Sequence, residues 1–493
     1  MKELASLALD TAQVRGASYA DVRIVDHQEQ TIHTKNGAVE SLSEIKDHGI
    51  GVRVIADGAW GFASSAVLDK AEVERVAAQA VEIAHASALV QQGPVNIGPP
   101  VTSTGTYCTP VEIDPFSVSP KDKVALLLEA DRAMRRAKCA GGGVTTAKGT
   151  LICLRELKTF ANSEGAFVEQ EIVESGGGLT AVAISDGEVQ QRSYPNSFGR
   201  DQRTAGWESI QQVDLPGNAE RIANEAVALL SATACPSTVT TLILGSTQLA
   251  LQIHESCGHP TELDRVFGSE AAYAGTSFLT PDKLNTLRYG SPAVNLTADA
   301  TTPGGLGTFG WDDEGVPAQR IELVKEGLFV GYLSSRETAA QLACLNGLDP
   351  TEARSGGTMR ASSWSRIPLI RMTNISIEPG DWTFDDLIAD TDEGIYMEMN
   401  RSWSIDDKRL NFQFGTEMGY EIKNGKLGRM LKNCTYTGIT PQFWNTCDAV
   451  CNRDHWRVWG TPNCGKGQPS QIAHTGHGAA PARFRNVRVG VMK

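Results

Sequence analysis

The chain has 493 residues, enough for about two to four domains, because one hydrophobic core rarely grows past about 250–300 residues. Its 41% hydrophobic and 21% charged residues are those of an ordinary globular protein. The net charge of −13 is spread along the chain without a basic stripe, which excludes nucleic acid as the expected partner. The sequence also contains no apolar run of the ~18–20 residues that cross a membrane.

The first residues predict an amphipathic surface helix at about 2–15, interrupted by Glu3 and Asp10. This pattern differs from the continuous apolar core of a secretion signal. The ten Cys residues are scattered and form no compact disulfide framework. We therefore expect a cytoplasmic protein with reduced thiols.

Residues 1–92 predict a small α+β unit. Alternating segments predict strands at Tyr19–Val25 and Gly49–Ala56, and Asn-Gly and Asp-Gly pairs at 36–37 and 57–58 predict hairpin turns. An apolar stripe predicts a closing helix over Asp69–Leu89, with Asp69 as its N-cap.

A second unit of similar plan is expected at 119–235, after a linker at 93–118 that is rich in Gly, Pro, Ser and Thr. We expect a helix at about 120–138, strands at about 142–192 and a helix at Asn218–Ser231. The glycines at 141–143, 165 and 176–178 predict the turns between those strands.

Residues 236–493 predict a mostly β domain, since short apolar segments alternate with Gly, Asn, Asp and Thr. One helix is expected to interrupt it, over Thr247–Cys257. The fold class is therefore α+β: two small helix-strand-helix units followed by a mostly β domain that carries this helix.

The end of that helix places His254, Glu255 and His259 close together. Imidazole is a common zinc ligand, and a neighbouring carboxylate can take a proton from a metal-activated water. The usual zinc helix separates its histidines by four residues, whereas five residues turn His259 about 140° away from His254. Both can reach one ion only if the helix widens, as in a π-bulge, or breaks at Gly258 and Pro260.

The segment H-E-S-C-G-H resembles the HExxxH signature of the TldD/PmbA family of metalloproteases. Further likeness lies in G-V-R-V-I-A-D-G-A-W-G-F-A-S-S at 51–65, D-D-E-G-V-P-A-Q-R at 312–320, G-L-F-V-G-Y-L-S-S-R-E-T-A at 327–339 and C-G-K-G-Q-P at 464–469. The resemblance covers essentially the whole chain, and it is to the active, metal-binding form of the family.

This resemblance implies a metallopeptidase in which His254, His259 and Cys464 bind one divalent ion, zinc or iron, and Glu255 is the general base. It also implies a peptide substrate, short or unfolded, and a homodimer or a heterodimer with a ligand-lacking paralogue. A thiolate among the ligands favours zinc over magnesium or calcium. The sequence leaves two other functions open: a modulator or binding protein with a structural metal, and a metal-dependent amidase acting on a modified peptide.

Other Cys, His and acidic residues could bind a metal but also have a structural interpretation. Cys447, Cys451 and His455 have a spacing that could bind a metal, although buried apolar thiols are the favoured interpretation of the two cysteines. His474 and His477 could line the site, although a solvated glycine-rich loop is favoured. The acidic run 312–314 is interpreted as a solvated turn.

Overall fold

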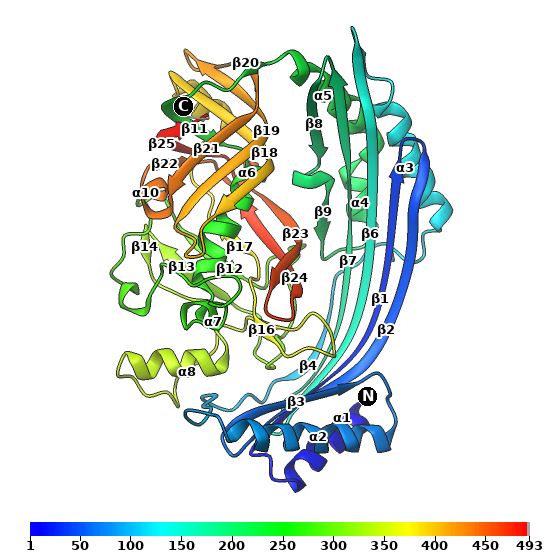
Figure 1. Ribbon diagram of the computed structural model, residues 1–493, viewed down its shortest axis with the longest axis vertical. Helices are drawn as coiled ribbons and strands as arrows, with labels where there is room; N and C mark the ends of the chain where they lie inside the picture. The colour runs from blue at the N-terminus through cyan, green and yellow to red at the C-terminus, as the bar shows by residue number, and fades with distance from the viewer. Residues whose placement is uncertain (491–493) are drawn as a thin grey trace.

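The computed structural model describes residues 1–490, and it confirms the α+β class with a mostly β C-terminal domain. A long curved sheet from the N-terminal half stands beside a compact C-terminal body, with helices on the outer side and at one end of the sheet (Figure 1). Within those residues, every helix is too short or too polar to serve as a membrane span.

The N-terminal sheet has nine strands, and its main path runs β3-β2-β1-β6-β7-β4. Its strands are β1 Tyr19–Lys35, β2 Ala38–Ala56, β3 Ala59–Ser65, β4 Thr104–Cys108, β5 Lys138–Cys139, β6 Gly142–Asn162, β7 Phe167–Ser185, β8 Glu188–Tyr194 and β9 Asp201–Arg203. The two predicted units share this sheet, because β1 of the first pairs antiparallel with β6 of the second.

The turns of this sheet match the sequence only in part. Asn36 and Asp57 adopt φ angles of 51° and 50° at the predicted hairpins. The glycines at 176–178, however, lie inside β7 rather than at a turn, so that prediction is wrong. They allow close backbone contact instead, since a β-carbon on Gly178 would lie 2.3 Å from the carbonyl oxygen of Gly199.

Two groups of helices pack against the sheet over separate cores. One group packs on β1–β3, and the other packs on β6–β8. The first comprises α1 Lys2–Val14 and α2 Lys70–Ala88, and the second comprises α3 Pro120–Met134, α4 Glu208–Val213 and α5 Leu215–Ser231. Asp69 accepts a hydrogen bond from the Glu72 backbone N–H at 2.9 Å, which confirms the predicted N-cap of α2.

The C-terminal body is built around an eight-stranded sheet whose pairings close on themselves. β11 pairs with β18, β18 with β19, β19 with β21, β21 with β25, and β25 with β11. The strands of this sheet are β10 Thr233–Ala234, β11 Thr238–Leu244, β18 Glu393–Ile405, β19 Asn411–Lys423, β20 Lys426–Lys432, β21 Cys434–Ile439, β22 Cys447–Val450 and β25 Ala482–Val489.

Smaller sheets and short helices complete this body. The strands are β12 Leu296–Asp299, β13 Arg320–Lys325, β14 Leu328–Phe329, β15 Met359–Arg360, β16 Leu369–Ile370, β17 Ile375–Ile377, β23 Arg457–Lys466 and β24 Gln471–Ala479. The helices are α6 Ser246–Ile253, α7 Leu263–Val266, α8 Arg336–Leu345, α9 Phe384–Ala389 and α10 Thr440–Asn445. The expectation of one helix in this domain is therefore wrong, because further helices lie between the strands, and α8 is longer than α6 itself.

The acidic run at 312–314 is buried, not solvated, with each residue about 1% exposed. The Asp313 carboxylate forms ion pairs with Lys158 at 3.0 Å and with Arg23 at 3.5 Å, and the Glu314 carboxylate forms one with Arg53 at 3.5 Å. Burial raises the pKa of Asp313, but Lys158 and Arg23 outweigh it and hold that pKa below its ordinary value. These ion pairs join the C-terminal body to the long sheet.

Replacing Asp313 with Asn should destabilise the protein, because buried Arg23 would lose its carboxylate partner and Lys158 would keep only Glu156. The expected loss is about 3–5 kcal/mol, the usual cost of breaking a buried ion pair from one side. Urea unfolding followed by tryptophan fluorescence would show a lower midpoint than that of the exposed control Asp381→Asn. Equal midpoints for the two variants would contradict this role for the run.

Candidate metal centre

A strand and a widened helical turn position the two predicted histidines. β11 leads through Gly245 into α6, which continues into a π-helical turn at His254–Gly258 and a 3₁₀ turn at His259–Thr261. The backbone N–H of His259 donates to the carbonyl of His254, five residues back. The structure therefore confirms the predicted widening, and this turn presents both imidazoles on one side.

Neighbouring side chains stabilise the widened turn by donating hydrogen bonds to backbone carbonyls that would accept from backbone N–H groups in a regular helix. Thr261 Oγ1 donates to the carbonyls of Cys257 and Gly258, and Tyr289 Oη donates to that of Ser256 at 2.8 Å. Gly258 suits this position because a β-carbon there would lie 2.2 Å from a side-chain atom of the residue packed on the turn, Met372 Sδ.

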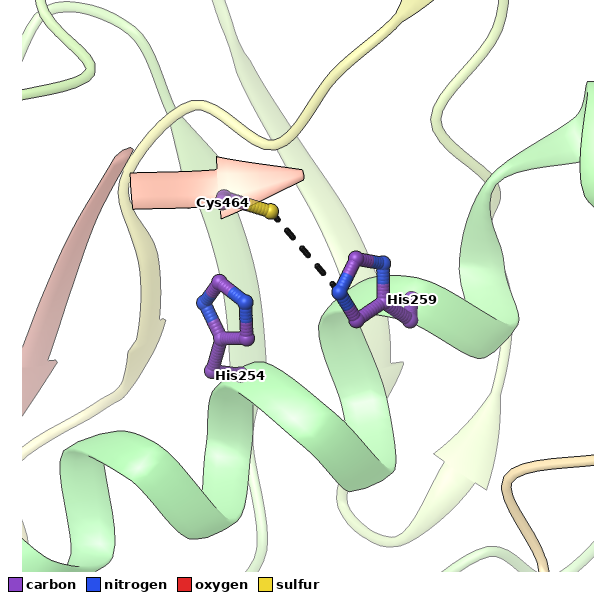
Figure 2. A group of neighbouring side chains, drawn as sticks. All are labelled: His254, His259 and Cys464. Carbon is purple, nitrogen blue, oxygen red and sulfur yellow. Dashed lines mark hydrogen bonds between the residues drawn. The ribbon is translucent and has the colours of Figure 1, made fainter. Parts of the chain in front are cut away.

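The fold brings His254, His259 and Cys464 together although Cys464 lies about two hundred residues later (Figure 2). One ligand atom from each lies within 4.8 Å of the other two, and His259 Nε2 is 3.7 Å from Cys464 Sγ. Cys464 is on β23, the first strand of the hairpin that it forms with β24. All three side chains are buried, so the group is a preformed internal cluster.

A hydrogen-bonded chain fixes which nitrogen of His254 is free. His477 Nδ1 lies 3.2 Å from the Ile375 carbonyl, which can only accept, so this nitrogen carries the proton. His477 Nε2 then accepts from His254 Nδ1 at 2.7 Å. His254 Nε2 consequently keeps its lone pair on the side of His259 and Cys464, as a metal ligand requires.

Glu262 plays the same part for His259. Its Oε2 accepts from His259 Nδ1 at 3.1 Å, which leaves Nε2 of that ring unprotonated toward Cys464. Lys466 lies 3.3 Å from the same carboxylate oxygen and 2.6 Å from Asp264. Glu262 is therefore a buried, charge-paired carboxylate that orients the imidazole.

Burial and neighbouring charges favour the protonation states that bind metals. Burial lowers the pKa of His254 and lowers those of His259 and His477 well below the ordinary range. Burial raises the pKa of the Cys464 thiol, but His259 and Arg371 outweigh it and bring that pKa below its ordinary value. These shifts keep the imidazoles neutral and make the Cys464 proton easier to remove than that of an ordinary buried thiol.

Glu255 faces a cavity of about 260 Å³ at the centre. Its Oε2 accepts from Arg409 Nη1 at 2.7 Å, while Oε1 has no hydrogen-bond partner among residues 1–490. Phe198 and Trp403 border the same cavity with ring centroids 5.6 Å apart. The arrangement leaves one carboxylate oxygen available beside the two histidines.

Of the remaining candidates, His477 contacts the centre through His254, whereas Cys447, Cys451 and His455 lie away from it. Cys447 and Cys451 are buried in the apolar core, as favoured, and His455 Nε2 accepts from the Phe384 N–H at 3.1 Å. His474 and His477 lie on β24 rather than in a solvated loop, so that interpretation is wrong. It failed because Gly476 and Gly478 sit in a strand against which the side chains of Asn374 and Trp456 pack closely.

Sequence reasoning also missed residues that complete the centre. Glu262 could have been predicted from the sequence, because an acid three positions after His259 on a helix lies beside its imidazole. Arg409 lies in the turn between β18 and β19, far from the motif, and no local pattern marks it.

The donor set fits a tetrahedral zinc ion. Typical zinc–nitrogen and zinc–sulfur bonds separate two such ligands by about 3.6 Å. The observed Nε2–Sγ separation of 3.7 Å is close to this value. Two imidazoles and one thiolate suit zinc or another soft transition metal and leave a fourth position open.

Family models match nearly the whole chain. Residues 20–84 match PmbA/TldA metallopeptidase domain 1, residues 113–232 match the central domain, and residues 237–490 match the C-terminal domain.

Individual proteins that resemble this chain are named metalloproteases or share its fold. A metalloprotease of Methanocaldococcus jannaschii is 30% identical over 88% of this chain and 89% of its own. A zinc metalloprotease TldD homolog of Saccharolobus solfataricus is 26% identical over 42% of this chain and 43% of its own. The crystal structure of TldE from Thermococcus kodakarensis shares the fold, with a TM-score of 0.75, 18% identity, and coverage of 99% of this chain and 100% of that one.

In metal-free protein, iodoacetamide should label Cys464 before Cys447 and Cys451. Cys464 borders the cavity and its pKa lies below 9.0, whereas burial raises the pKa of Cys447 and Cys451 to about 12. Because the thiolate reacts, the labelling rate at Cys464 should rise at lower pH than the rate at Cys447 or Cys451. Peptide mass mapping after short pulses measures each site, with exposed Cys108 and Cys344 as references. Labelling of Cys464 only after denaturation would contradict the expectation.

Proposed function

The chain belongs to the PmbA/TldD family of metallopeptidases, and from that premise we propose that it hydrolyses short or unfolded peptides at the His254–His259–Cys464 centre. The observation that carries the proposal is the gathering of three ligand atoms within 4.8 Å of one another. Glu255, held by Arg409 at 2.7 Å, stands beside them on the same cavity. A purely structural metal site has no need of such a base.

We propose one zinc ion per chain, bound by Nε2 of His254, Nε2 of His259 and Sγ of Cys464. A divalent ion held there would polarise the scissile carbonyl and acidify a water molecule. Iron is the alternative ion, because imidazole binds both metals. The hydrogen bonds from His477 and Glu262 support the proposal by holding each imidazole in the tautomer and orientation that ligation needs.

Glu255 is the proposed general base. Arg409 occupies Oε2 and fixes the carboxylate, so Oε1 remains free to accept a proton from the attacking water. The protonated carboxyl then donates that proton to the leaving amine nitrogen, which restores the carboxylate. Buried surroundings favour this shuttle because few solvent molecules compete for the proton.

The peptide is proposed to bind in extended form along β23. Residues 460–465 of this strand line the cavity, and the strand is paired only with β24 within residues 1–490. Backbone pairing recognises any extended peptide and gives broad sequence tolerance. The exposed rings of Phe198 and Trp403 add apolar contact at the mouth of the cavity.

Replacing Glu255 with Ala or Gln should lower kcat for peptide hydrolysis about 10²–10⁴-fold, the usual contribution of a general base. Bound metal should remain near the wild-type amount, because Glu255 is not a proposed ligand. A fluorogenic peptide library digest, run with metal analysis on the same preparations, measures both. Near-wild-type hydrolysis by either variant would remove Glu255 from the mechanism.

Replacing Cys464 with Ala should lower the zinc content after dialysis, since only two protein ligands would remain. Cys451→Ala is the matched control, because that thiol is also buried but lies in the apolar core. Elemental analysis of both variants, with circular dichroism as a check of folding, makes the comparison. Stoichiometric zinc in the Cys464 variant would place the third ligand elsewhere.

A further inference from the structure

A second, larger cavity adjoins the metal centre. It measures about 410 Å³ and lies between strands β1, β6 and β7 of the long sheet and the C-terminal body. Arg200 and Pro462 line both this cavity and the one that contains Glu255. Arg200 directly precedes β9, which lies next to β23 (Figure 1). A peptide leaving the metal centre past Arg200 would enter the larger cavity.

The carboxylates that line this larger cavity are already paired. Glu156 forms an ion pair with Lys158 at 3.1 Å, and Glu174 forms one with His474 at 2.6 Å. Glu29 faces His27 at 3.7 Å, and Asp313 is held by the ion pairs described above. Each of these four acids therefore already has a basic partner, and Asp313 and Glu174 act on Arg360 only at longer range.

Two arginines of the cavity lack such partners. The side chain of Arg200 is half-buried and forms no hydrogen bond or ion pair with any residue between 1 and 490. Arg360 donates to the Met372 carbonyl and lies over the Phe309 ring, but it pairs with no carboxylate in that range, and its buried Nε has no hydrogen-bond acceptor. Burial lowers the pKa of both guanidinium groups, which reflects the cost of holding these charges away from water.

The backbone before Arg200 is held in an unusual conformation. Phe198 and Gly199 have φ angles of 63° and 64°, and a β-carbon on Gly199 would lie 2.2 Å from Thr180 Oγ1. Left-handed backbone at a non-glycine residue is costly and persists where the surroundings demand it. Here it directs Phe198 toward the metal centre and Arg200 to the junction of the two cavities.

We propose that Arg200 binds a carboxylate of the peptide substrate in the cavity between the long sheet and the C-terminal body, which Arg360 also lines. This inference rests on the proposed peptidase function and adds a preference for peptides that present a free carboxylate near the scissile bond. A guanidinium suits the task because its fork of N–H donors matches both oxygens of a carboxylate. The carboxylate is either the C-terminus of the peptide or the side chain of Asp or Glu near the scissile bond.

Matched peptides test the proposal and separate the two sources. Each fluorogenic peptide is prepared as free acid and as C-terminal amide, and with Glu or Gln beside the cleaved bond. Wild-type protein should hydrolyse one acidic form with a KM about tenfold or more below that of its neutral counterpart, at similar kcat. Arg200→Gln should lose this preference while still cleaving the neutral peptide, whereas the exposed Arg457→Gln, at the start of β23, should keep it.

The outcomes separate this inference from the proposed function. Equal KM values for acidic and neutral peptides in the wild type would overturn the inference and leave the peptidase function intact. Retention of the preference in Arg200→Gln would also overturn it. If no peptide is hydrolysed, binding still tests the inference. Fluorescence anisotropy of labelled peptides with the Glu255→Gln protein should give a lower Kd for the form that carries the carboxylate. That difference should disappear when Arg200→Gln is added.

Discussion

The hydrogen bond from the His259 N–H to the His254 carbonyl is the constraint on which the centre depends. In a regular helix a five-residue offset would turn the second imidazole about 140° from the first. The π-helical turn removes that rotation, and Thr261 and Tyr289 satisfy the carbonyls that the widening frees. The close contact of Gly258 with Met372 then holds the turn against the rest of the domain.

Buried hydrogen-bond partners decide which ring nitrogen of His254 and of His259 carries the proton. The Ile375 carbonyl sets the proton of His477, and His477 in turn sets that of His254. Glu262, paired with Lys466, does the same for His259. Each lone pair that faces Cys464 is therefore assigned before any metal arrives, which reduces the reorganisation that binding requires.

The long sheet and the C-terminal body depend on each other through buried charges. Asp313 and Glu314 of the C-terminal body form ion pairs with residues of the sheet, namely Lys158, Arg23 and Arg53. These contacts also close one side of the cavity that adjoins the metal centre, since Lys158 and Asp313 both line it. The N-terminal half thus supplies part of the surface that a peptide would meet, although the three metal-binding candidates come from the C-terminal domain.

The sequence alone determined the features that depend on neighbouring residues. The caps and hairpin turns at Asn36, Asp57 and Asp69 follow from local backbone chemistry, and the spacing of His254 and His259 required a widened or broken turn. Only the tertiary structure decided what depends on distant pairing: the joining of two units through β1 and β6, the burial of the acidic run, and the placing of His477 and Arg409 at the centre. A solvated loop and a buried strand can share the same glycine-rich composition, and the difference between them is set by the distant residues that pack against them.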